Sequence, residues 1–369
     1  MADLLILLRR IASYCWTKAL HCLNGEDYDL QSKDNIGYQK GTLSIAAVHD
    51  HYPPHEFVQV VSASSLTFLG IYDGHMGYQA STYVCENILN HVLNLAERSK
   101  MVSEHVLGEA IVATESGYQE LVRASNDPNG AFSTVGSCCL IAILWKNRIF
   151  LANLGDSEAV VGRFRLNKMI AVPLNSIHNT RSFDERNRVN EKKSRFYYES
   201  DPLFRPLLSS EPETFSYILE DDDNFLIVAS HGFWAHLSKD EAVHIVHNYP
   251  RMGIAARLVN RAMNKALIIE RSWRPTMGRG HPDDMTVVVI FMDWKIRAPA
   301  GSAGVYLSVR SSEDGRLIED KITDDDSMVG EHLRRLGDLN TMLELDKIAA
   351  RNERRSARRQ LRADLGFLV

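Results

Sequence analysis

Strand-like and helix-like blocks alternate along residues 42–293, and several strand-like blocks follow one another directly. Residues 134–145 are apolar and β-branched and, after a short polar turn, residues 149–152 are apolar again, which predicts a β-hairpin. Apolar residues recur at helical spacing in 80–92 and 106–121, which predicts two helices that pack side by side. Consecutive strands flanked by helices favour an α+β fold with antiparallel sheets over strict βαβ alternation.

Two further helices are expected later in the same region. Ser238 and Glu241 form a capping box, in which each side chain bonds to the backbone N–H of the other residue, and apolar positions follow through Val246. Residues 254–266 repeat an apolar side chain at every fourth position, which predicts the next helix.

The two ends of the chain differ from the middle in residue composition and in hydrophobic pattern. Residues 1–39 combine an apolar run with basic residues and predict a helical extension, which either lies at a membrane interface or packs on the domain. After Asp293, residues 294–325 contain small residues and an acidic stretch, and we expect a linker there. Residues 330–363 lack proline and end in arginines, which predicts a basic helical tail. The main domain is therefore expected at 40–293.

Composition narrows the class of protein without naming a substrate. Hydrophobic residues make up 45% of the 369-residue chain, and the formal net charge is −5, so no basic field points to nucleic acid as a partner. No apolar run approaches the roughly 18 residues of a transmembrane segment. The five cysteines form an odd, sparse set without a Cys-x-x-Cys pair, which indicates a reducing compartment. We expect an intracellular monomer, in the cytoplasm or nucleus.

Four polar turns, each placed next to a strand-like run, carry the candidate chemistry. Carboxylates at strand ends, with glycines that allow close backbone approach, provide the oxygen ligands that Mg²⁺ and Mn²⁺ require. Any one such turn is a common structural feature, so the argument depends on their joint order. The turns contain Asp73-Gly74-His75, Asp156, His231-Gly232, and Asp283-Asp284.

In this order and spacing the turns resemble those of the protein phosphatase 2C family of metal-dependent serine/threonine phosphatases, especially its plant branch. The resemblance covers residues 40–293 and includes the stretches 135–139, 233–234 and 283–291. It implies two packed antiparallel β-sheets flanked by helix pairs, with a centre for two Mn²⁺ or Mg²⁺ ions at one end. It also implies a phosphoprotein or another protein as the partner.

The resemblance assigns roles to individual residues. Asp73 would lie between two metal ions, the carbonyl of Gly74 would bind one of them, and Asp283 would complete the set. Asp156 matches an acid near an additional, weaker metal position. His75 would protonate the leaving alkoxide, a role that suits an imidazole because its pKa lies near neutrality.

The sequence departs from the family pattern at several positions. His231 stands where the family has a metal-binding aspartate, which replaces an anionic oxygen ligand by a nitrogen. His55-Glu56 stands where Glu-Asp is usual, and Met76 stands where glycine is usual. A glycine-rich family segment is not reproduced between Arg163 and Glu220.

Two hypotheses follow from these departures. In the first, the chain keeps the family fold but has little or no phosphatase activity and serves as a binding module. In the second, it is a working Mn²⁺-dependent phosphatase in which His231 acts as a metal ligand. Other enzyme classes fit worse, because the sequence contains no Gly-x-Ser-x-Gly elbow and no phosphate-binding loop ending in Gly-Lys-Ser/Thr.

Overall fold

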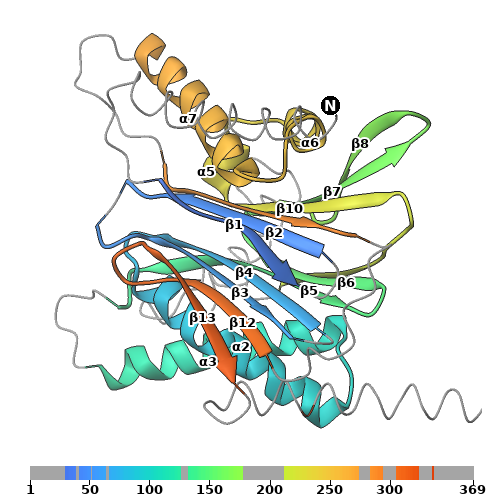
Figure 1. The fold of residues 1–369 in the computed structure, drawn as a ribbon. Helices are drawn as coiled ribbons and strands as arrows, with labels where there is room; N and C mark the ends of the chain where they lie inside the picture. The colour runs from blue at the N-terminus through green and yellow to red at the C-terminus, as the bar shows by residue number, and fades with distance from the viewer. Residues whose placement is uncertain are drawn as a thin grey trace, which may run out of the picture.

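The protein is a four-layer sandwich in which two β-sheets pack face to face and helices cover both outer faces (Figure 1). This architecture is seen in a computed structural model. The structure describes residues 30–38, 41–50, 52–63, 66–125, 132–177, 212–273, 283–293, 305–323 and 335.

The first sheet has six strands, and every neighbouring pair is antiparallel. Its strands, from edge to edge, are β1 (Gln31–Tyr38), β2 (Gly41–Val48), β11 (Met285–Phe291), β10 (Asp223–Ala229), β7 (Glu158–Arg165) and β8 (Lys168–Pro173).

The second sheet has seven strands and is also antiparallel throughout. Its strands, from edge to edge, are β13 (Leu317–Thr323), β12 (Val305–Ser311), β3 (Glu56–Ser62), β4 (Leu66–His75), β5 (Gly136–Trp145), β6 (Arg148–Leu154) and β9 (Glu213–Ile218). The predicted hairpin at 134–152 is confirmed as β5 and β6.

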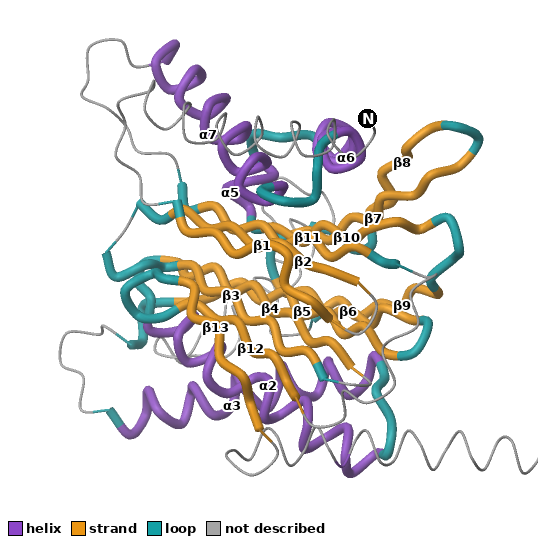
Figure 2. The backbone as a smooth tube through the Cα atoms, viewed as in Figure 1, coloured by secondary structure: helices purple, strands orange, loops and turns teal. Residues whose placement is uncertain are grey.

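Helices flank the sandwich on both sides (Figure 2). The seven-stranded sheet carries α2 (Gln79–Ser99) and α3 (Glu104–Ala124). The six-stranded sheet carries α5 (His231–Trp234), α6 (Lys239–Asn248) and α7 (Ile254–Trp273). All seven residues of β11 are buried, because this strand has the other sheet on one face and helices on the other. The α+β prediction of two antiparallel sheets between helices is confirmed.

The predicted capping box at the start of α6 is half correct. The Ser238 hydroxyl accepts a hydrogen bond from the backbone N–H of Glu241 at 3.3 Å, as predicted. The Glu241 carboxylate instead accepts from Nε of Arg261 at 2.9 Å and pairs with Lys265, both on α7. Glu241 therefore links two helices and does not close the cap.

Both expected domain boundaries need correction. Residues 31–38, expected in a helical extension, form the edge strand β1 that pairs with β2. The expected linker contains β12 and β13, and β12 pairs with β3 through the register Val309↔Val60. The pattern of 305–323 is too short and too mixed to predict a sheet, but Val309 and Leu317 are buried once the hairpin is docked. The sandwich therefore extends from β1 to β13.

Other predictions lie outside the described residues. These are the helix in the first 29 residues, most of the segment between Arg163 and Glu220 where family sequence is missing, and the basic tail, of which only Arg335 is described. None of the helices in the described part of the chain is long and apolar enough to cross a bilayer.

Candidate metal centre

The four polar turns meet at one end of the sandwich because each follows or precedes a central strand. Asp73 lies near the end of β4, directly across from Cys138 in the β4–β5 register. His231 follows β10 and Asp283 precedes β11, and these two strands are neighbours in the six-stranded sheet. Asp156 lies in the turn between β6 and β7, which carries the chain from one sheet to the other.

Two glycines allow the turns to approach closely. A Cβ atom on Gly232 would lie 2.1 Å from the carbonyl oxygen of Asp284, so only glycine lets the β10–α5 turn pack on the start of β11. A Cβ atom on Gly74 would lie 2.6 Å from the Ser81 hydroxyl. The backbone N–H of Gly74 donates to the carbonyl of His55 at 3.0 Å, which ties β4 to the loop before β3.

His231 contacts an acid of the neighbouring turn. Its Nδ1 atom lies 3.1 Å from Oδ2 of Asp156, close enough for a charge-assisted hydrogen bond. This hydrogen bond raises the pKa of His231, against the opposing effect of burial. Burial also disfavours ionised Asp156, but the hydrogen bond and charge of His231 outweigh it and lower the pKa of Asp156. The pair therefore favours an imidazolium and a carboxylate.

Asp73 is buried among several other carboxylates, those of Asp283, Asp156 and Asp284. Burial, followed by the charges of Asp283 and Asp156, raises the pKa of Asp73 to about 7. The charge of His231 acts in the opposite direction and favours the Asp73 carboxylate. The imidazole thus supplies positive charge to a cluster of acids that would otherwise repel one another.

The predicted acid His75 is half exposed at the edge of this cluster. Its Nε2 atom lies 3.0 Å from the Cys138 sulfur, and its Nδ1 atom lies 3.9 Å from Oδ1 of Asp73. The Cys138 sulfur also lies 3.8 Å from Oδ1 of Asp156. Cys138 is therefore the side chain that connects His75 with the His231–Asp156 pair. No role was predicted for Cys138, although it lies on a predicted strand and pairs with Asp73 in the β4–β5 register.

Glu56 is a second residue whose place sequence reasoning left open. It is 1% exposed and lies opposite Asp73 in the β3–β4 register. Burial, with the charges of Asp73 and Asp284, holds the pKa of Glu56 well above its ordinary range. Among the described residues, no side chain or backbone group bonds to its Oε2 atom. Pairing of β3 with β4 would have predicted that Glu56 lies beside Asp73.

Asp284, next to the predicted ligand Asp283, bonds to the segment just before β3. Its carboxylate accepts from the backbone N–H groups of Asp50 at 2.6 Å and His55 at 3.3 Å. Nδ1 of His49 lies 3.7 Å from the same carboxylate. This arrangement gives Asp284 a structural role, because it holds His49, Asp50 and His55 beside the start of β11.

Met76, where the family usually has glycine, adopts a left-handed backbone conformation with φ of 63°. Its side chain is 82% exposed, directly after His75. Such a φ is uncommon for a residue with a Cβ atom, which is the physical reason that glycine suits this turn.

The donor set does not fit a centre for two Mg²⁺ or Mn²⁺ ions as it is arranged. Asp73, Asp283 and the Gly74 carbonyl are hard oxygen donors, but Nδ1 of His231 and Oδ2 of Asp156 are directed at each other. Within the described part of the chain, no group of three or more His, Cys, Asp or Glu side chains is placed to hold a metal ion. The contact with Asp156 raises the pKa of His231, and a protonated imidazole has no lone pair with which to bind a metal ion.

Comparison with known proteins identifies the class of this fold. The sequence model of the family Protein phosphatase 2C matches residues 45–268. "Probable protein phosphatase 2C 43" from Oryza sativa subsp. japonica is 32% identical, over 83% of this chain and 95% of its own length. "Probable protein phosphatase 2C 68" from Arabidopsis thaliana is also 32% identical, over 72% of this chain and 81% of its own.

A solved structure has the same fold. The crystal structure of serine-threonine phosphatase 2C from Toxoplasma gondii superposes with a TM-score of 0.55 at 17% identity, over 72% of this chain and 99% of that chain. The chain therefore belongs to the protein phosphatase 2C family, and the rice and Arabidopsis relatives confirm the predicted similarity to its plant members.

Proposed function

We propose that this protein uses the protein phosphatase 2C fold to bind a phosphoprotein or another protein, with phosphatase activity that is impaired or absent. The observation that carries the proposal is the 3.1 Å contact between Nδ1 of His231 and Oδ2 of Asp156. It engages Nδ1 with a neighbouring acid and favours the protonated ring, in which neither nitrogen has a lone pair to offer a metal ion.

The charge balance of the site supports this proposal. Two divalent cations bring four positive charges, and the family's donor set opposes them with carboxylates. Exchange of one carboxylate for His231 removes a negative charge, and protonation of the imidazole adds a positive one. Asp73, Asp283 and the Gly74 carbonyl then remain as donors, and too little negative charge is left to bind two cations tightly.

The alternative of an active phosphatase would require divalent cations that lower the pKa of a water nucleophile and neutralise the phosphoryl oxygens. His75 would supply a proton to the leaving oxygen, and its contact with Cys138 holds the imidazole at the edge of the acidic cluster. Retention of His75 without a full donor set is consistent with a binding site that has lost most of its catalytic power.

Metal titration of the full-length natural chain and two variants tests the proposal. Isothermal calorimetry with MnCl₂ and MgCl₂ should find no tight Mg²⁺ site and at most a weak Mn²⁺ site in the natural chain. His231→Asp restores a carboxylate and should strengthen Mn²⁺ binding by about 10-fold or more. His105→Asp, a matched exchange on exposed helix α3, controls for the change in net charge and should leave Mn²⁺ binding unaltered.

Turnover of a phosphothreonine peptide separates metal binding from activity. Because positioning contributes as much as the metals, His231→Asp alone should bind Mn²⁺ better yet hydrolyse the peptide slowly. Asp73→Ala serves as the blank. If the natural chain already hydrolyses the peptide with Mn²⁺, and Asp73→Ala abolishes this, then the alternative of an active Mn²⁺-dependent phosphatase replaces the proposal.

A further inference from the structure

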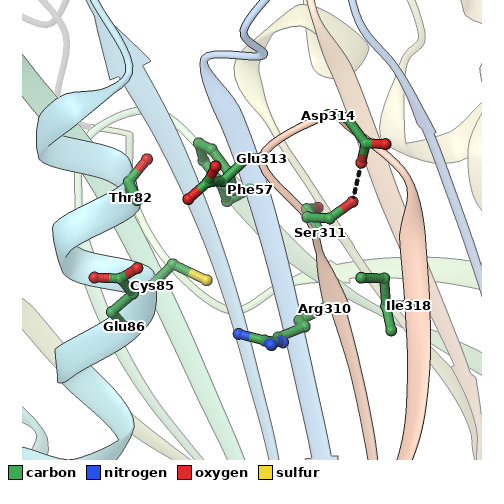
Figure 3. Close-up of a pocket in the computed structure, with 10 residues that line it drawn as sticks. Phe57, Thr82, Cys85, Glu86, Arg310, Ser311, Glu313, Asp314 and Ile318 are labelled. Atoms are coloured by element: carbon green, nitrogen blue, oxygen red, sulfur yellow. Dashed lines mark hydrogen bonds between the residues drawn. The ribbon is translucent and has the colours of Figure 1, made fainter.

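A groove of about 430 Å³ lies between helix α2 and the β12–β13 hairpin (Figure 3). Phe57 and Cys85 form a buried apolar floor, and Ile318 closes one side. A second hollow of about 230 Å³ shares Phe57 and Thr82 with the first. The two therefore form one continuous groove, which runs on toward the region just after His75 through its lining residue Tyr78.

The rim of the groove is more acidic than basic. The lining residues include three carboxylates and one guanidinium (Figure 3). The carboxylates belong to Glu86 on α2 and to Glu313 and Asp314 in the β12–β13 turn, and the guanidinium belongs to Arg310. Asp314 already has a partner, because Nε of Arg316 lies 3.4 Å from its carboxylate. Within the described residues, Glu86 and Glu313 make no ion pair. Two carboxylates thus remain available to a cationic ligand that covers the apolar floor.

The chain itself carries a ligand of this chemistry beyond β13. Its arginines recur at spacings of three and four, which would put them along one face of a helix. They are Arg351, Arg354, Arg355, Arg358, Arg359 and Arg362. Neighbouring apolar residues, Ile348 and Leu361, match the apolar floor of the groove.

One described residue of the tail already contacts the helix that forms the groove. Nη1 of Arg335 lies 2.9 Å from Oε1 of Glu97, near the end of α2. Glu97 is about 16 Å along the helix from Glu86. The 16 residues from Arg335 to Arg351 span about 24 Å as a helix and more when extended, so the arginine segment can reach the groove.

From this complementarity we infer that the arginine segment, residues 347–366, docks in the groove between α2 and the β12–β13 hairpin of its own chain. Arginine side chains would pair with Glu86 and Glu313, and the apolar residues would cover Phe57 and Ile318. The inference does not depend on whether the domain is an active phosphatase.

A labelled peptide in trans tests the docking in the full-length protein. The probe is a fluorescein-labelled synthetic peptide of residues 347–366, and the readout is fluorescence anisotropy at fixed salt. The natural chain should bind it weakly, because its own segment competes at an effective concentration in the millimolar range. A full-length variant with Arg351, Arg354, Arg355 and Arg358 all changed to Gln, called the Gln-tail variant, should bind it about tenfold more tightly.

Two matched pairs of substitutions locate the binding site. In the Gln-tail variant, Glu86→Arg with Glu313→Arg should weaken peptide binding at least tenfold, since both partners of the arginines become repulsive. Glu120→Arg with Asp320→Arg makes the same charge change on exposed positions of α3 and β13 outside the groove, and should leave peptide binding unchanged. Thermal melts of each variant verify that the fold is retained.

The outcomes separate the possible occupants. Equal binding of the peptide to the natural chain and the Gln-tail variant would overturn the inference, because the tail would then not occupy the groove. Such a result fits a groove open to a basic segment of another protein, or arginines that pair with the acidic stretch 324–326. Absence of binding to the Gln-tail variant, or binding that survives the Glu86 and Glu313 exchanges, would overturn it as well.

Discussion

His231 and Asp73 illustrate how single residues set the charge state of the acidic cluster. The imidazole pairs with Asp156 and also favours the ionised form of Asp73. Despite this, burial and the neighbouring acids keep the Asp73 pKa at about 7. A carboxyl with a pKa raised on folding stabilises the protein only while it can hold its proton. That contribution is complete below about pH 3.8 and is lost as the pH rises through 7.

Asp73→Asn should therefore stabilise the metal-free protein, and more at pH 8 than at pH 5. The neutral amide removes the cost of a buried charge, which amounts to about 1–4 kcal/mol at pH 8 when shared among coupled acids. Urea unfolding at both pH values, with EDTA present, measures the gain. Asp320→Asn on exposed β13 is the control and should show no such pH dependence. A gain at pH 5 equal to that at pH 8 would contradict the explanation.

At the residue scale, the order of the turns along the chain is readable from the sequence, whereas the contacts between individual side chains are not. Asp73, Asp156, His231 and Asp283 are brought together at one end of the sandwich, as the order of the turns predicted. The hydrogen bond from His231 to Asp156 joins residues far apart in the chain, and no local pattern encodes it. Glu56 was noted only as a departure from the family pattern, and no local pattern shows that β3 pairs with β4 and buries it opposite Asp73.

At the scale of single elements, Ser238 and Glu241 at the start of helix α6 make two different kinds of contact, a helix cap and an ion pair with α7, where a capping box would have both residues cap the helix. Ser238 caps the helix by accepting from the N–H of Glu241, while the Glu241 carboxylate pairs with Arg261 and Lys265 of α7. Capping by a hydroxyl is a short-range neutral interaction. The ion pairs are partly exposed and are weakened by salt.

Ser238→Ala should therefore cost about 1 kcal/mol of unfolding free energy at any salt concentration, because the helix loses its cap. Glu241→Gln should cost no more than about 1 kcal/mol at low salt and less at high salt. Urea unfolding at low and high NaCl distinguishes the two. A cost for Glu241→Gln that does not change with salt would mean that the side chain supports the cap and not the α6–α7 contact.

Elements with strong local patterns were predictable, and those defined by distant partners were not. The β5–β6 hairpin has two apolar runs and a polar turn, and α2 and α3 have clear helical spacing, so both were found from the sequence. The edge strand β1 pairs with β2, and β12, which lies between β13 and β3, joins the sheet through β3; both are less apolar than the central strands. Without those partners their sequences are typical of an extension and a linker.

For the whole molecule, the position of β12 and β13 decides where the folded domain ends. The hairpin covers the edge of β3, and the Ser311 hydroxyl accepts from the backbone N–H of Val58 at 3.0 Å. Val309 and Leu317 are 0% and 6% exposed. Removal of the hairpin would expose apolar side chains and leave β3 as an unpaired edge, which favours aggregation.

A chain that stops after Asp293 should therefore be less stable than the natural protein by about 3–6 kcal/mol, which is the value of burying two aliphatic side chains. A chain that stops after Thr323 keeps the hairpin and is the matched control; it should unfold close to the natural protein. Urea unfolding and light scattering of the two truncations make the comparison. If the chain ending at Asp293 were as stable and soluble as the one ending at Thr323, the hairpin would be an appendage. Because β12 extends the same sheet that carries Asp73 and Glu56, we expect its loss also to loosen the strand pairing that buries them.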